Sequence, residues 1–387
     1  MITTYASGSE FEYLVATYFQ LQGYLVRKGL LYYENHSAIT EIDIYAIKFI
    51  RPFLSNTVVC DCKDKAKPKP VERILWAKGI GEFLNADNIF VALPKVSWEI
   101  INFASKKNIK VLTKDMVEES IKSAGVSPYS LADKDFYIPF YKKSFNLVQK
   151  NKELKAVIDD VRSLYIRENS YVALNRAFML IKKTREKLDL FDRNDVLYET
   201  WRYLLFELIV LVSLHITKIA YLCSGLREDI RDKHILMKLT FGESDPKKAK
   251  EILQLALEYA SRGTFHTDAS AMLSAEDIIV APKYASAIVG LVNWIYKDLE
   301  IYLLLPIFTD YLLFDQAFKT GSFDREKFSR IFGDKDIEKK LKATKNIMVL
   351  VKNNTNLDLK HIWPNEEQNM PSISASDKGA ETAPNGG

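Results

Sequence analysis

The stretch TEIDIYAIKFIRPFLSNTVVCDCKDKAK, Thr40–Lys67, holds two strand-like runs that carry charged residues. The runs Glu41–Phe49 and Thr57–Lys63 are rich in β-branched and aromatic residues, and the segment RPFLSN between them is typical of a turn. Acidic residues are depleted in strands, yet the first run contains Asp43 and the second contains Asp61. These two positions therefore need a physical reason.

Alternation along the second strand gives that reason. Residues two apart share a face, so Asp61 and Lys63 project together, while Cys60 and Cys62 project to the other side. If the two strands pair through the turn, Asp43 lies near Asp61, and such carboxylates repel each other unless a cation lies between them. Hard oxygen ligands suit Mg²⁺ or Mn²⁺, and Lys63 adds a positive charge beside them. The alternative is a solvated strand face whose surface ion pair contributes under about 1 kcal/mol.

The sequence around this stretch predicts an α/β unit. An amphipathic helix, SEFEYLVATYFQLQGY, precedes the strands, and prolines after them open a second helix. Three consecutive strands favour hairpin pairing, and the later strand–helix–strand order favours a parallel crossover, so we expect a mixed αβββαβ sheet with helices on both faces. Besides the two runs above, the predicted strands and helices after the first helix are strand 24–33, helix 70–84, strand 88–93, helix 97–107 and strand 109–113.

The pattern changes after residue 118, where nearly every segment has helical periodicity. We predict an α/β domain at 1–118, a linker at 119–135 and an all-α domain at 136–363. The segment 364–387 is poor in large apolar residues and is expected to be disordered.

The most apolar segment of the chain is Tyr203–Cys223. It contains Glu207, His215 and Lys218, and ionisable groups at bilayer depth each cost about 2.5 to 3.5 kcal/mol. This composition favours a buried helix of a soluble bundle over a membrane span. The beginning of the chain has no basic region followed by an apolar run, so we expect no secretory signal.

Composition limits the function further. Lys and Arg number 54 against 50 Asp and Glu, a net charge of +4, so any binding of a polyanion must be local. Cys60 and Cys62 lack a second Cys or His pair nearby, which favours buried strand cysteines over a zinc site, and three cysteines without a disulfide framework indicate a reducing, cytoplasmic location. No glycine-rich phosphate loop of the ATPase or dinucleotide kind occurs.

A basic segment, KDKAKPKPVER, directly follows VVCDC. Beside a phosphodiester site, such a run would hold a nucleic-acid backbone through sequence-independent contacts. The alternative is an ordinary solvated loop. The predicted nucleic-acid-binding residues are Lys65, Lys67, Lys69 and Arg73, with Lys78 on the following helix.

The order of GSEFEYLVATYFQLQGY, EID, VVCDCKDK and AKGIGEFLNADNIFVAL resembles the PD-(D/E)XK nuclease superfamily, closest to its Mrr-like restriction endonuclease and archaeal Holliday-junction resolvase branches. The resemblance covers residues 7–113. In that family a helical Glu, a strand Asp and a D/E-x-K element hold one or two Mg²⁺ ions and hydrolyse phosphodiester bonds. The resemblance implies these catalytic roles for Glu12, Asp43, Asp61 and Lys63, with Glu12, Asp43 and Asp61 as the metal ligands.

Two details qualify the match of residues. Glu12 is preferred to Glu10 because it directly follows Phe11, as the family's helical Glu follows an aromatic residue. The chain departs from the family at Ile42, where a Gly or Pro often precedes the strand aspartate.

The resemblance implies a restriction-endonuclease-like fold and a Mg²⁺- or Mn²⁺-dependent endonuclease, with DNA favoured over RNA as substrate. Restriction or defence against foreign DNA is the first expectation for biology, and repair or recombination comes next. Three questions stay open: whether the domain still cuts or only binds, whether it acts on RNA, and whether the helical domain binds a protein partner or a second copy of the chain. No membrane role is expected.

Overall fold

The computed structural model describes residues 9–34, 37–64, 69–124, 133–167, 169–263 and 279–363. Lys65, Lys67 and the predicted tail 364–387 lie outside them. The first part of the chain forms α1 (Ser9–Leu21), β1 (Leu25–Glu34), β2 (Ser37–Ile50), β3 (Leu54–Cys62), α2 (Pro70–Phe83), β4 (Asn88–Leu93), α3 (Trp98–Ser105), β5 (Ile109–Thr113) and α4 (Lys114–Ala124).

One five-stranded sheet organises this part, with the strands in the order β1-β2-β3-β4-β5. β1 pairs with β2 and β2 with β3 in antiparallel fashion, whereas β3, β4 and β5 run parallel. The predicted mixed sheet is therefore confirmed, since adjacent hairpins form where no helix intervenes and helical crossovers join the parallel strands. The predicted turn RPFLSN is shorter than expected, because β3 begins at Leu54.

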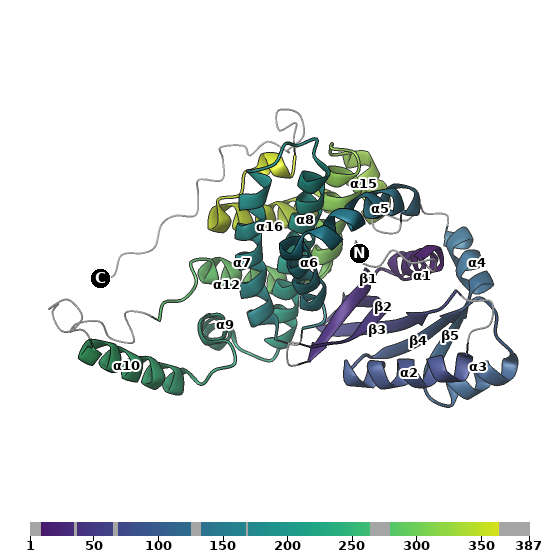
Figure 1. Cartoon of the computed structure of the whole chain (residues 1–387), viewed down its shortest axis with the longest axis horizontal. Helices are drawn as coiled ribbons and strands as arrows, with labels where there is room; N and C mark the ends of the chain where they lie inside the picture. The colour runs from purple at the N-terminus through teal and green to yellow at the C-terminus, as the bar shows by residue number, and fades with distance from the viewer. Residues whose placement is uncertain are drawn as a thin grey trace.

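Helices cover both faces of the sheet (Figure 1). On one face α1 and α4 pack over a core that includes Phe11, Val15 and Ile44. On the other face α2 and α3 cover a smaller core that includes Ile74 and Val91. Because the side chains of a strand alternate, the aspartates at odd positions of β2 and β3 lie on a different face from the neighbouring cysteines.

α4 corrects the predicted boundary between the two parts. It runs from Lys114 to Ala124, so the first residues of the linker predicted at 119–135 are helical. Val117 is buried and Ile121 packs beside it against the core under α1, which accounts for a helix where composition indicated a linker. Residues 125–132 lie outside the described residues.

The helical part of the chain follows from residue 134 onward and lies beside the β1 edge of the sheet (Figure 1). Its segments are α5 (Lys134–Lys150), α6 (Lys152–Leu164), α7 (Ser170–Leu188), α8 (Val196–Leu222), α9 (Glu228–Phe241), α10 (Pro246–Gly263), α12 (Ala285–Lys297), α13 (Leu299–Tyr302), α14 (Leu305–Asp310), the π-helical η3 (Tyr311–Phe318), α15 (Arg325–Phe332), α16 (Ile337–Thr355) and the short 3-10 turn η4 (Leu359–His361).

α8 is the central helix of this part. By length and composition it is apolar enough to cross a membrane, but 94% of its most apolar window is buried inside the protein. Around it pack α7, α12, α14 and α16. The predicted buried helix is thus observed, and its burial is consistent with a soluble protein.

The sheet and the helical part share one continuous core. α6 and α14 pack against β1, and a single apolar cluster contains Leu30 and Ile42 of the sheet together with Leu164 and Phe308 of the helices. The carboxylate-bearing strand β2 is therefore supported by helices that are far away in the sequence.

Candidate functional site

The register of β2 and β3 brings the two aspartates together. Ile44 pairs with Cys60 in the antiparallel ladder, so the next positions along the pair are Asp43 and Asp61. Asp61 is also in register with Val91 of β4, which makes β3 an inner strand at this point. The two carboxylates thus lie at the carboxyl end of β3, where α2 begins after a short connection.

Lys63 contacts both carboxylates. Its Nζ lies 3.1 Å from Asp43 Oδ2 and 3.9 Å from Asp61 Oδ1. Its backbone N donates to Ala92 O at 3.1 Å, so the residue is still fixed to β4 just beyond the end of β3. Burial opposes the charge on Lys63, but the two aspartates outweigh it and raise the pKa of the ammonium.

Asp43 is held on one oxygen and is half-buried. Oδ2 accepts a hydrogen bond from the backbone N of Cys62 at 2.9 Å as well as from Lys63. Burial and the charge of Asp61 raise the pKa of Asp43 to about 6, against the opposing effects of Lys63 and Cys62. A further positive charge beside Asp43 would therefore stabilise the ionised form of its carboxylate.

Glu12 lies on α1 and interacts electrostatically with Asp43 and Lys28. Burial, and next the charge of Asp43, raise its pKa to about 7, while Lys28 of β1 lowers it. Glu10 is exposed. The structure therefore places Glu12 near Asp43 and leaves Glu10 on the surface.

Arg73 lies in the first turn of α2 and not in a loop, and it binds Asp61. Its predicted contact with nucleic acid stays a prediction. Nε donates to Asp61 Oδ2 at 2.7 Å, and a second guanidinium nitrogen binds Oδ1. The Asp61 side chain is fully buried and that of Arg73 is 25% exposed, so Asp61 does not lie on a solvated strand face, the alternative considered above.

Four other residues were predicted to bind nucleic acid. Lys65 and Lys67 lie outside the described residues, whereas Lys69 and Lys78 each form an ion pair. Lys69 pairs with Glu72 at 2.8 Å, and Lys78 pairs with Glu82 at 2.9 Å. Both pairs lie on α2 or at its beginning, on the side of the sheet that Asp61 faces. Carboxylates of the same helix thus offset part of the positive charge that the sequence suggested.

The thiols of β3 project to the opposite face of the strand from Asp61. Cys60 and Cys62 are buried and free, with their sulfurs 3.8 Å apart in the core under α1. Burial raises the pKa of both thiols. They are buried strand cysteines of the core, as predicted from the sequence.

We call Glu12, Asp43, Asp61, Lys63 and Arg73 the sheet-end cluster. Its acceptors are carboxylate oxygens, the ligands that Mg²⁺ and Mn²⁺ prefer. Over the described residues, no group of three or more His, Cys, Asp or Glu side chains is arranged to hold a metal ion. Lys63 and Arg73 supply the positive charge at the two aspartates instead.

A second charged cluster, which the sequence did not reveal, joins the sheet to the helical part. Arg27 of β1 donates to Glu207 of α8 at 2.8 Å and to Asp310 of α14 at 2.7 Å. Tyr165 and Tyr203 donate to the Glu207 carboxylate. We call these five residues the joint cluster, and they are all buried.

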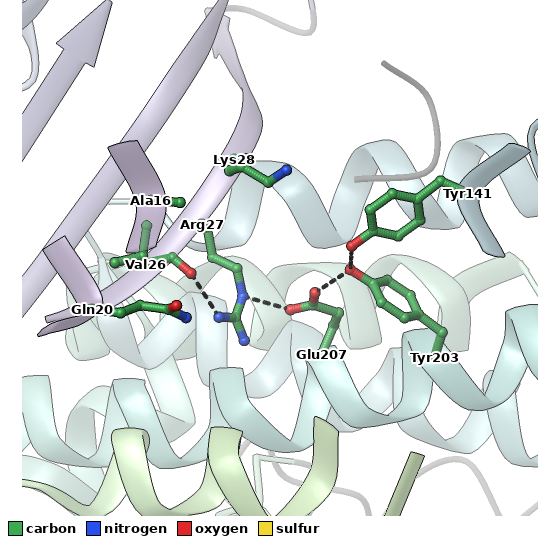
Figure 2. A pocket seen from close by; sticks show the side chains of 8 residues that line it. All are labelled: Ala16, Gln20, Val26, Arg27, Lys28, Tyr141, Tyr203 and Glu207. Carbon is green, nitrogen blue, oxygen red and sulfur yellow. Dashed lines mark hydrogen bonds and ion pairs between the residues drawn. The ribbon is translucent and has the colours of Figure 1, made fainter. Parts of the chain in front are cut away.

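Figure 2 shows three residues of this cluster, Arg27, Tyr203 and Glu207, in the lining of a small pocket beside β1. Arg27 points toward Glu207, and Tyr203 connects Glu207 to Tyr141. Lys28 also lines the pocket, and its ammonium lies over the ring of Tyr13 in α1. Burial opposes the charge of Arg27, but Asp310 and Glu207 raise the pKa of its guanidinium well above the ordinary value. Two consecutive residues of β1 therefore act on different clusters. Arg27 belongs to the joint cluster, and Lys28 interacts electrostatically with Glu12 of the sheet-end cluster.

A further contact reaches the strand that carries Asp43. Arg162 of α6 donates to the carbonyl of Gly29 and to Glu41 Oε1, the latter at 2.8 Å. Glu41 is two residues before Asp43 on β2 and therefore on the same face. The only hint in the sequence was the presence of charged residues in apolar strands, which signals a buried partner without naming it.

Comparison with protein-family models, with curated proteins and with solved structures finds no match to this chain.

Proposed function

We propose that the chain is a metal-dependent nuclease that hydrolyses phosphodiester bonds, with DNA as the favoured substrate. The observation that supports this best is the meeting of Asp43, in the middle of β2, with Asp61 and Lys63 at the carboxyl end of β3. The Lys63 ammonium lies 3.1 Å from Asp43 and 3.9 Å from Asp61. An acidic pair beside a lysine is the arrangement that the D/E-x-K resemblance implies. Restriction or defence in the cytoplasm is the proposed biological role.

The carboxylate oxygens of the sheet-end cluster are ligands of the type that Mg²⁺ and Mn²⁺ prefer. The raised pKa values of Glu12 and Asp43 indicate that this end of the sheet holds carboxylates close together under burial, a condition that a divalent cation relieves. Asp43 and Asp61 would hold the ion with Glu12 assisting. When bound, the ion supplies polarisation of the phosphate and activation of water.

The chain's own residues supply the rest of the chemistry. Lys63 is fixed by its backbone bond to Ala92, and its ammonium stabilises negative charge that develops on a phosphate oxygen. The carboxylate of Asp43 keeps Lys63 charged by raising its pKa. Loss of one such electrostatic group costs about 100- to 1,000-fold in rate in other enzymes.

One observation favours a second candidate, a nuclease-like binding protein that does not cut. Both oxygens of Asp61 are engaged by Arg73, and Asp61 is fully buried. In this alternative the ion pair is permanent, and the helical part acts through a protein partner. RNA cleavage on the same site is the third outcome that the assay below distinguishes.

The test is a cleavage assay on plasmid and branched DNA and on single-stranded RNA, with Mg²⁺, Mn²⁺ or chelator. We expect metal-dependent cutting of DNA, no detectable cutting by Asp61→Asn, and a loss of about 100-fold or more in Lys63→Met. Glu72→Gln is the matched control, because Glu72 is an exposed carboxylate on the same helix as Arg73. Wild-type protein that cuts none of these substrates with any metal would favour the binding protein, and cutting of RNA alone would favour the RNA nuclease.

A further inference from the structure

Arg73 occupies the position that decides whether Asp61 is available. Its guanidinium binds both oxygens of the buried carboxylate, and a quarter of its own side chain reaches solvent. Arginine does not lose its proton at ordinary pH, so this competition for Asp61 is not removed by titration. Hydrogen bonds to Asp61 raise the pKa of Arg73 further.

A second contact holds Arg73 near the site independently of Asp61. The guanidinium carbon lies 4.8 Å from the centre of the Trp76 ring, one helical turn further along α2. A cation over an aromatic face is stabilised without any carboxylate. If Asp61 turns to another cation, Arg73 keeps this anchor and stays at the carboxyl end of β3.

The freed guanidinium would be suited to a phosphate. Its planar fork of N–H donors matches two phosphate oxygens in the way it now matches the two oxygens of Asp61. Lys63, beside it, carries a compact charge without this geometry. The two cations of the sheet-end cluster are therefore not interchangeable.

We propose that Arg73 exchanges partners: it binds Asp61 in the metal-free protein and binds a backbone phosphate of the substrate once Asp61 holds a divalent cation. This inference rests on the proposed function and makes Arg73 a substrate-binding residue as well as a latch on the metal site. Metal and nucleic acid then bind cooperatively, because the cation releases the group that recognises the phosphate.

Two binding measurements on the full chain test the exchange without relying on activity. Mn²⁺ affinity is measured by calorimetry without nucleic acid, and affinity for a short DNA duplex is measured by anisotropy with and without Mn²⁺ at 4 °C, with gels to verify intact duplex. The variants are Arg73→Gln and Arg73→Lys. The control is Lys69→Gln, which removes an exposed positive charge at the beginning of the same helix.

We expect Arg73→Gln to bind Mn²⁺ about tenfold more tightly than wild type, because a charged competitor for Asp61 is gone. The same variant loses most of the gain in DNA affinity that Mn²⁺ gives the wild type. Arg73→Lys keeps the positive charge but lacks the planar guanidinium, so we expect both its Mn²⁺ affinity and its Mn²⁺-dependent gain in DNA affinity to lie between those of wild type and Arg73→Gln. Lys69→Gln leaves Mn²⁺ affinity unchanged and weakens DNA binding equally with and without metal.

Three outcomes overturn the exchange. If Mn²⁺ binds wild type and Arg73→Gln equally, or binds the variant more weakly while its melting temperature is unchanged, Arg73 is not a competitor for the metal. If Mn²⁺ increases DNA affinity as much in Arg73→Gln as in wild type, Arg73 does not bind the phosphate. If neither wild type nor Arg73→Gln binds Mn²⁺, the proposed nuclease site is overturned together with the exchange. In the two preceding outcomes, metal-dependent cutting by wild type would preserve the nuclease site and overturn the exchange alone.

Discussion

The sheet-end cluster and the joint cluster are built from the same kinds of residues but differ in access to solvent. In the joint cluster the side chains of Arg27, Glu207 and Asp310 are at most 1% exposed. In the sheet-end cluster the side chains of Asp43, Arg73 and Lys63 are 14%, 25% and 30% exposed. A buried ion pair with every group satisfied is closed to ligands, whereas a partly open one can exchange its partners.

This difference supports the proposal that the sheet-end cluster, and not the joint cluster, is the functional site. Burying a charge is costly unless it is paired and hydrogen-bonded, so the joint cluster fixes the helical part to the sheet in one arrangement. The sheet-end cluster holds Glu12 and Asp43 with pKa values raised to about 7 and about 6, so part of its charge is poorly compensated. Groups perturbed in this way at the end of a sheet are typical of functional sites.

Breaking the joint cluster should have the largest effect. Arg27→Ala leaves Glu207 and Asp310 buried without their shared partner, and we expect it to lower the free energy of unfolding by about 3 to 5 kcal/mol. Arg51→Ala is the matched control, because the Arg51–Glu300 pair also joins the sheet region to the helical part but both side chains are 56% exposed. Its expected effect is below about 1 kcal/mol. Urea unfolding measures both, and equal losses would contradict the distinction between buried and open pairs.

Removing one hydroxyl from the joint cluster should have a smaller effect. Tyr165 donates a hydrogen bond to the buried Glu207 carboxylate. Tyr165→Phe should lower the free energy of unfolding by about 1.5 to 3 kcal/mol, the usual range for a hydrogen bond to a charged group. Tyr259→Phe, at a side chain that is largely exposed on α10, should change nothing measurable. A Tyr165→Phe protein as stable as wild type would mean that the network tolerates an incompletely bonded carboxylate.

The sheet-end cluster should respond to pH in the opposite sense from an ordinary ion pair. The pKa of Glu12 is raised from 4.5 in the unfolded chain to about 7, so the folded state binds more protons between these values. In chelator, the contribution of Glu12 to stability therefore falls as pH rises from 4.5 to about 7 and is flat above. Glu12→Gln should remove this slope and stabilise the protein at pH 8 by about 1 to 2 kcal/mol.

Chemical denaturation of both proteins across this pH range measures the slope. Asp87→Asn, at a carboxylate near the opposite end of β3 that accepts a hydrogen bond from Thr57, is the control and should keep the wild-type pH slope. If Glu12→Gln destabilises the protein equally at every pH, Glu12 contributes as an uncharged packing group and not as a buried carboxylate of the site.

The arrangement of the sheet could be predicted from the sequence because its signals are local. Alternation in VVCDCK assigns Asp61 and Lys63 to one face, and the turn before β3 brings Asp43 beside them. The parallel strands β4 and β5 were found at their observed positions, since each is a short apolar run after a helix. α4 was missed because its small and polar residues also suit a linker.

The partners within the clusters could not be predicted in the same way. Arg27 binds residues that are 180 and 283 positions away, and no periodicity connects positions so distant. Arg73 lies only 12 positions from Asp61, but the basic segment around it indicated a solvated loop. A partial signal was present, because Pro70 is typical of the start of a helix and so indicates that Arg73 lies in the first turn of α2.

The most direct test of the central claim is a crystal structure determined with saturating Mn²⁺ and anomalous scattering data. We predict one strong anomalous peak at the carboxyl end of β3, about 2.0 to 2.2 Å from oxygens of Asp43 and Asp61, with Arg73 withdrawn from Asp61. A structure without a peak there, in which Arg73 still binds both oxygens of Asp61, would contradict the account.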